Sequence, residues 1–96
     1  MSRFVATRTD VNQPEIVAAL RGLGWQVWNL SGVASRANLP GWPDLLAVRA
    51  GRVTLIEIKH GKAPLTPDEQ TFHLCYGGEL AIVRTIDDCV RLTEGR

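Results

Sequence analysis

Two apolar runs separated by a two-residue turn constrain the fold of this chain more than any other feature. The runs cover residues 43–48 and 52–59, and Ala50-Gly51 lies between them. Runs rich in branched aliphatic residues on either side of such a turn are typical of a β-hairpin. Residues 45–48 are apolar throughout, as in a central strand that is covered on both faces. We therefore expect two antiparallel strands at the centre of the molecule.

The turn also sets which side chains face each other across the hairpin. With residues 50 and 51 as the central turn residues, Asp44 lies directly opposite Glu57. Directly opposed residues project to one face, with Cβ atoms about 4.5–5.5 Å apart. Lys59 shares this face because side chains alternate along a strand. A register shifted by one residue would instead place the two acids on opposite faces.

Two carboxylates at this separation in an apolar hairpin repel each other and cost stability. A divalent cation removes the conflict, since Mg²⁺ is typically held by one or two carboxylates and by phosphate oxygens of a substrate. The alternative is that Glu57 and Lys59 are polar residues on the solvent face of an amphipathic strand. The apolar residues around them favour a metal site at the end of a buried hairpin.

The rest of the chain alternates between helix and strand patterns. Asn12 and Thr66 are suited to cap helices, and Glu69 completes a capping box with Thr66. Residues 31–42 hold two glycines, a proline and little periodicity, so we expect a loop there. This order predicts a single α/β domain over residues 1–96. The expected helices cover residues 12–23, 66–76 and 86–92, and the further strands cover residues 25–30 and 79–84.

Composition excludes several classes of protein. The chain is 45% hydrophobic and 22% charged, a globular rather than a disordered balance. No apolar run approaches the length of a membrane span, and the N-terminus lacks an apolar signal core, so we expect a cytoplasmic protein without membrane contact. Cys75 and Cys89 form no CxxC spacing, which argues against a zinc site or a disulfide framework.

Basic residues are concentrated in the middle of the chain. Between residues 16 and 67 the only acids are Asp44 and Glu57. This distribution suits a surface for a polyanion with a metal site at its centre, and chance clustering in a short chain is the alternative. The basic residues of this stretch are Arg21, Arg36, Arg49, Arg52, Lys59 and Lys62.

An ordered set of short motifs resembles the PD-(D/E)xK nuclease superfamily and, within it, the VRR-NUC family of virus-type replication-repair nucleases. The set consists of Gly41-Trp42-Pro43-Asp44-Leu45, then Ile56-Glu57-Ile58-Lys59, then residues 65–70, which end with Gln70 on the following helix. The resemblance extends from the first helix to the strand that ends near Arg84. It implies a restriction-endonuclease-like core, with a small mixed sheet flanked by helices, and a DNA endonuclease that depends on Mg²⁺ or Mn²⁺.

The resemblance also implies roles for individual residues of the hairpin. Asp44 and Glu57 correspond to the two metal-binding carboxylates, and the backbone carbonyl of Ile58 to a further ligand. Lys59 corresponds to the lysine that positions or polarises the attacking water. The number of metal ions, one or two, stays open.

Two further residues match the family pattern from neighbouring helices. Gln70 corresponds to a catalytic glutamine that projects toward the same centre. Glu15 corresponds to an acid that completes the site through metal or water, or it serves only the dipole of the first helix. The sequence departs from the family at His73, where relatives more often have an aromatic residue.

Residues in the flanking loops are candidates for DNA binding. Arg36, His60 and Lys62 are expected to contact phosphates, which position a duplex without reading its sequence, or they are ordinary solvated groups. Trp42 either stacks on a base or packs in the core or in a subunit interface.

The resemblance to stand-alone family members implies a homodimer that acts on branched DNA, with four-way junctions as the favoured substrate. Two sites related by a two-fold axis can cut two symmetry-related strands. Nicking or flap cutting is equally compatible with the motifs. The alternatives from other classes are a non-catalytic DNA-binding or assembly module that retains the nuclease fold, and a purely structural small α/β protein.

Overall fold

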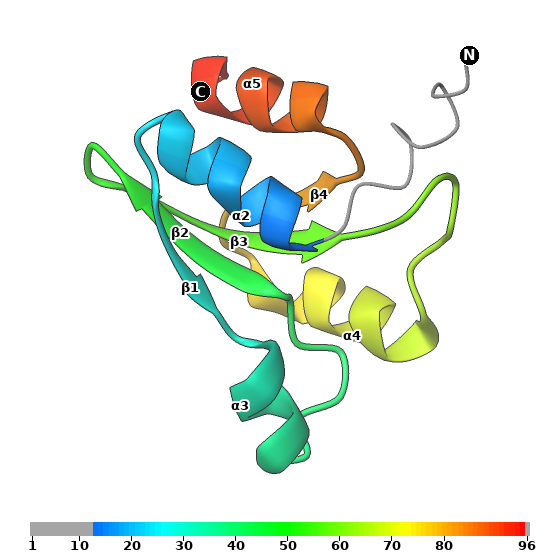
Figure 1. Ribbon diagram of the computed structural model, residues 1–96. Helices are drawn as coiled ribbons and strands as arrows, with labels where there is room; N and C mark the ends of the chain where they lie inside the picture. Colours follow the sequence, from blue (N-terminus) through cyan, green and yellow to red (C-terminus); the bar gives the residue numbers. More distant parts are fainter. Residues whose placement is uncertain (1–12, 96) are drawn as a thin grey trace.

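A four-stranded sheet with helices on both faces forms the centre of the computed structural model, which describes residues 13–95 (Figure 1). The strands are β1 (Gln26–Asn29), β2 (Leu45–Arg49), β3 (Arg52–Ile58) and β4 (Leu80–Val83), and the helices are α2 (Gln13–Gly22), α3 (Ser31–Arg36), α4 (Pro67–Tyr76) and α5 (Ile86–Glu94). Asn12, the expected cap of the first helix, lies outside the described residues. Within residues 13–95, no helix is long and apolar enough to cross a membrane.

The sheet is mixed, and its strand order β1-β2-β3-β4 follows the chain. β1, β2 and β3 pair antiparallel, whereas β4 runs parallel to β3. A parallel pair needs a crossover connection, and the segment containing α4 provides it. These features confirm the expected α/β class, with a small mixed sheet flanked by helices.

The central hairpin has the expected register. Arg49 pairs with Arg52 across the turn Ala50-Gly51, whose two residues adopt φ angles of 50° and 79°. Positive φ at both central residues is the requirement of a type I′ turn, which matches the twist of the flanking strands. Asp44 lies just before β2, where its N–H donates to the Ile56 carbonyl at 3.0 Å. Continued by one step, the same register puts Asp44 opposite Glu57.

Alternation along the strands divides their side chains between two faces of the sheet. Ile56 is fully buried on one face and belongs to the core that includes Leu20 of α2. Leu46 and Leu55 lie on the other face, where they line an apolar pocket that also includes Phe72 of α4. Figure 1 shows α2 and α5 on one side of the sheet and α4 on the other. Glu57, two residues after Leu55, therefore faces α4.

The segment at residues 31–42 differs from the loop that its composition indicates, because it begins with the six-residue helix α3. Asn29 Oδ1 accepts a hydrogen bond from the Ser31 N–H at 2.9 Å, and the Ala34 N–H donates to the Leu30 carbonyl at 2.9 Å. A side-chain acceptor before the first turn thus satisfies a backbone donor that a helix start leaves free. The glycine within α3 lowers intrinsic helix propensity, which is why the sequence indicated a loop. This expectation was wrong for residues 31–36, which form a helix.

The loop after α3 approaches α4 closely at Gly41. This glycine has a φ of 86°, and a Cβ added to it would collide with the backbone carbonyl of Asp68 in the first turn of α4. Only glycine adopts this φ without strain and leaves room for the contact. The motif glycine therefore brings the chain that leads to Asp44 alongside α4.

Candidate active site

Four polar residues gather on the α4 side of the sheet, near the end of β3. Asp44 precedes β2, Glu57 lies in β3, Lys59 follows β3, and Glu69 belongs to α4. The hairpin register places the first two, and the crossover from β3 to β4 adds the helix that carries the fourth. Asp44, Glu57 and Lys59 are three of the residues predicted from the sequence, whereas Glu69 was predicted only as a helix cap.

Both carboxylate oxygens of Asp44 are held by hydrogen bonds. Asp44 Oδ2 accepts from the backbone N–H of Ile58 at 2.8 Å, and Oδ1 accepts from Ser31 Oγ at 3.3 Å. The N–H and C=O of a strand residue point to the same side, so the Ile58 carbonyl is directed toward the Asp44 side of β3. Nothing in the sequence indicated Ser31, because its contact with Asp44 depends on the tertiary placement of α3.

Glu57 is an acid in an unfavourable environment. The residue is 3% exposed, and its Oε1 is buried without a hydrogen-bond partner among the described residues. The pKa of Glu57 is raised from 4.5 to about 8, chiefly by burial and also by the nearby carboxylates of Asp44 and Glu69, against the opposing effect of Lys59. A buried acid with an unused oxygen is costly unless something compensates its charge.

Lys59 lies between two carboxylates. Its Nζ is 2.6 Å from Glu69 Oε1 and 4.0 Å from Glu57 Oε2. The side chain of Lys59 is 13% exposed and that of Glu69 is 16% exposed, so the ion pair is largely shielded from water. Burial works against the Glu69 anion, but hydrogen bonds from Lys59 and from the Thr66 N–H hold its pKa below the ordinary value.

The donor atoms fit a hard divalent cation. Asp44, Glu57 and the Ile58 carbonyl offer only oxygen, which is the ligand type that Mg²⁺ and Mn²⁺ prefer. The unpartnered Glu57 Oε1 is the atom that such an ion would satisfy. Residues 13–95 contain no group of three or more His, Cys, Asp or Glu side chains able to hold a metal. The predicted set has two carboxylates and one carbonyl.

Gln70 does not share the contacts of its neighbour Glu69. Gln70 is exposed, and its Nε2 donates to the Leu65 carbonyl at 3.1 Å. Glu69, one position earlier, is the α4 residue in contact with Lys59. Successive helix residues point about 100° apart, so the rotation of α4 selects one of the two.

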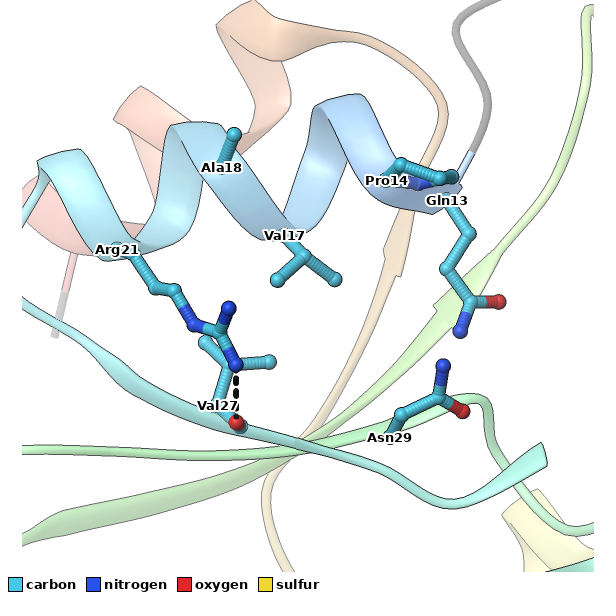
Figure 2. Close-up of a pocket in the computed structure, with 7 residues that line it drawn as sticks. All are labelled: Gln13, Pro14, Val17, Ala18, Arg21, Val27 and Asn29. Carbon is cyan, nitrogen blue, oxygen red and sulfur yellow. Dashed lines mark hydrogen bonds between the residues drawn. The ribbon is translucent and has the colours of Figure 1, made fainter. Parts of the chain in front are cut away.

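Glu15 lies in the first turn of α2 and is exposed. α2 packs on the face of the sheet opposite to Glu57, with Ile16 and Leu20 in the core. The start of α2 also borders a pocket of about 470 Å³ between this helix and β1 (Figure 2). There Arg21 donates to the Val27 carbonyl at 3.1 Å.

The loop residues expected to contact DNA are exposed, as such contacts require. His60 and Lys62 follow β3 directly, and Arg36 ends α3. Lys62 also lines a pocket of about 490 Å³ together with Arg84 and Arg91. The two arginines come from the segment after β4 and from α5, so only the tertiary structure brings them next to Lys62.

Trp42 packs against α4 while keeping part of its ring exposed. It is 39% exposed, and its ring meets Phe72 edge-on at 6.5 Å between centroids. Phe72 in turn stacks on Tyr76 at 5.6 Å. Both a packing role and contact with a base are therefore compatible with the position of Trp42.

Comparison with known proteins identifies no relative of this chain. The chain matches no family model, no curated protein and no solved structure. A functional conclusion has to come from the geometry of the site.

Proposed function

We propose that this chain is a divalent-metal-dependent nuclease that hydrolyses phosphodiester bonds of DNA. The observation that carries the proposal is the buried Glu57 carboxyl, which lies beside Asp44 with one unpartnered oxygen, while Lys59 occupies the same face. A purely structural role gives no reason to keep two acids together at a buried position, since an uncompensated pair costs stability. A site for a cation gives that reason.

The residues of the site have two different chemical roles, cation binding and stabilisation of negative charge. Asp44, Glu57 and the Ile58 carbonyl would hold the cation, and Asp44 is fixed for this role by Ile58 N–H and Ser31 Oγ. A bound divalent ion supplies charge neutralisation and an activated water for phosphodiester hydrolysis. Lys59 donates from Nζ on the same side and stabilises the negative charge that develops on the phosphate.

We further propose that the chain is a VRR-NUC-type member of the PD-(D/E)xK superfamily with a restriction-endonuclease-like core. The order of the motifs supports this, and so does the antiparallel meander followed by a crossover to a parallel strand. Lys62 and Arg84 supply positive charge after the ends of β3 and β4, which suits contact with a phosphate backbone. A homodimer that cuts branched DNA extends this proposal and rests on the family resemblance.

Cleavage of labelled DNA tests the proposal directly. Duplex, flap and four-way junction substrates are incubated with Mg²⁺ or Mn²⁺ and the wild type, Asp44→Asn, Lys59→Ala or Asp87→Asn. Asp87 is an exposed acid at the start of α5, so Asp87→Asn controls for the loss of one carboxylate. We expect full cutting by the wild type and Asp87→Asn, none by Asp44→Asn and only slow residual cutting by Lys59→Ala, with both of the latter folded by circular dichroism.

Two other outcomes decide between the alternatives. Equal DNA binding by all four proteins without cutting of any substrate would favour a non-catalytic DNA-binding module. No DNA binding, with effects of Asp44→Asn on stability alone, would favour a structural protein.

A further inference from the structure

We propose that Glu69 is a positioning residue, which anchors the Lys59 ammonium group over the carboxylate pair; the role rests on the proposed nuclease function. The sequence indicated Glu69 only as part of the capping box of α4, and the family resemblance implies no role for it at the site. It acts through Lys59 rather than on the substrate itself.

The ion pair between these residues is the shortest contact of the Lys59 ammonium. Lys59 Nζ lies 2.6 Å from Glu69 Oε1, compared with 4.0 Å from Glu57 Oε2. A lysine has a flexible four-carbon side chain, and its ammonium takes many positions unless an acceptor holds it. Glu69 is that acceptor, and the low exposure of both side chains limits competition from water.

Glu69 is itself held rigidly by the capping box of α4. Its Oε1 accepts the Thr66 N–H at 2.8 Å, and the Glu69 N–H donates to Thr66 Oγ1 at 3.3 Å. The oxygen that receives Lys59 is thus fixed at the helix start. Gly41 leaves room for the Asp68 carbonyl of the same turn of α4, so the chain that leads to Asp44 passes close to this turn. Glu69 therefore positions Lys59 from a helix start that lies beside this chain.

This arrangement has a consequence for catalysis. Stabilisation of a developing charge depends on donors that are already in place, and a displacement of about 1 Å can cost roughly a hundred-fold in rate. Loss of the Glu69 anchor leaves the Lys59 charge intact but removes its fixed position. The chemical step should suffer, whereas DNA binding through the exposed basic residues should not.

Glu69→Gln separates this role from helix capping. Glutamine also completes a capping box, so the Thr66 N–H keeps its acceptor while the negative charge opposite Lys59 is lost. Asp68→Asn is the matched control, because Asp68 is an exposed acid in the same helix turn and is not paired with Lys59. Both variants remove one charge from the N-terminal end of the helix.

Amine labelling measures how far Glu69 protects the Lys59 amine, and it does not require nuclease activity. Lys59 and the exposed Lys62 are the only lysines of the chain, so Lys62 serves as an internal reference. Labelling with an acetylating reagent, followed by mass spectrometry, gives the modification rate of Lys59 divided by that of Lys62. We expect this ratio to rise about five-fold in Glu69→Gln, as loss of a shielded ion pair predicts, and to stay unchanged in Asp68→Asn.

Single-turnover cleavage then tests the consequence. We expect the cutting rate of Glu69→Gln to fall roughly ten- to hundred-fold with unchanged DNA affinity. Adding Glu69→Gln to Lys59→Ala should cause no further loss, because the two residues act as one unit. A purely structural role would give additive losses instead.

Each contrary result has a distinct meaning. An unchanged labelling ratio would show that Glu69 does not anchor Lys59. Unchanged or faster cutting by Glu69→Gln, or additive losses in the double variant, would overturn the positioning role. A wild type that cuts no DNA would defeat the nuclease proposal and this role with it, while the labelling ratio would still decide whether the anchor exists.

Discussion

Glu57 illustrates how a single residue can be kept at a cost to stability. The carboxyl group is buried beside Asp44 and Glu69, and one of its oxygens has no hydrogen-bond partner within residues 13–95. An unsatisfied buried group costs about 1–3 kcal/mol, and more when it is charged. A glutamine has the same shape and donates N–H bonds that neighbouring carboxylates can accept. The metal-free protein should therefore prefer glutamine.

We expect Glu57→Gln to raise the free energy of unfolding in EDTA by about 1–3 kcal/mol above pH 8. The pKa of Glu57 is raised from 4.5 to about 8 in the folded protein, so the native state favours the protonated acid. The advantage of glutamine should thus be absent below pH 4.5 and grow as the pH rises to 8. Urea unfolding measures it, with the exposed Glu94→Gln as control.

Mg²⁺ should reverse this preference. A ligand that binds only the native state stabilises it, so Mg²⁺ should raise the melting temperature of the wild type and of Glu94→Gln but not that of Glu57→Gln. Equal stability of the wild type and Glu57→Gln in EDTA, or an equal response of both to Mg²⁺, would contradict the cation site at this residue.

At the scale of elements, the site depends on the contact between the loop after α3 and the start of α4. Gly41 brings the two backbones together, and the capping box of Thr66 and Glu69 fixes the helix start that receives the loop. Neither element buries many side chains: no residue of α3 or α4 is fully buried. The close approach at Gly41 and the edge-on contact between Trp42 and Phe72 therefore join the loop to α4 on this side of the molecule.

Gly41→Ala should break this fit. Alanine at a φ of 86° is strained, and its Cβ would collide with the Asp68 carbonyl, so we expect a loss of at least about 2 kcal/mol of stability. Gly22→Ala is the control, because an added Cβ there meets no described atom within 4 Å. Urea unfolding of both variants measures this loss of stability. A Gly41→Ala protein as stable as Gly22→Ala would show that the close contact is not needed.

At the scale of the whole molecule, the sheet separates the buried core from the candidate site. α2 and α5 cover the face that holds the core, whereas α4 lies on the other face, which carries the candidate site (Figure 1). Lys62, Arg84 and Arg91 meet at the end of the sheet where the parallel strands β3 and β4 finish. The same pocket holds Asp88, which pairs with Arg91, so its remaining positive charge comes from Lys62 and Arg84.

We expect Lys62→Ala, in an inactive Asp44→Asn background, to weaken binding of all duplex sequences alike. The slope of log affinity against log salt concentration should fall by about one, as loss of one phosphate contact predicts. Arg21→Ala removes the same charge from α2, in a separate pocket between α2 and β1, and should leave the slope unchanged. Fluorescence anisotropy over a salt series measures both. Equal slopes would exclude Lys62 from the DNA surface.

The sequence by itself determined the features that depend on neighbouring residues. The turn at Ala50-Gly51 sets the hairpin register, and this register brings Asp44 toward Glu57. The Thr66 capping box begins α4 where the spacing indicates. Such features follow from local backbone geometry and hydrogen bonds, which a few adjacent residues specify.

Only the tertiary structure decided which partners reach the site from a distance. The rotation of α4 turns Glu69 rather than Gln70 toward Lys59, and the placement of α3 brings Ser31 to Asp44. The sequence pattern holds no signal for either contact. Both depend on how helices pack on the sheet, and that packing is set by the combined burial of residues far apart in the chain.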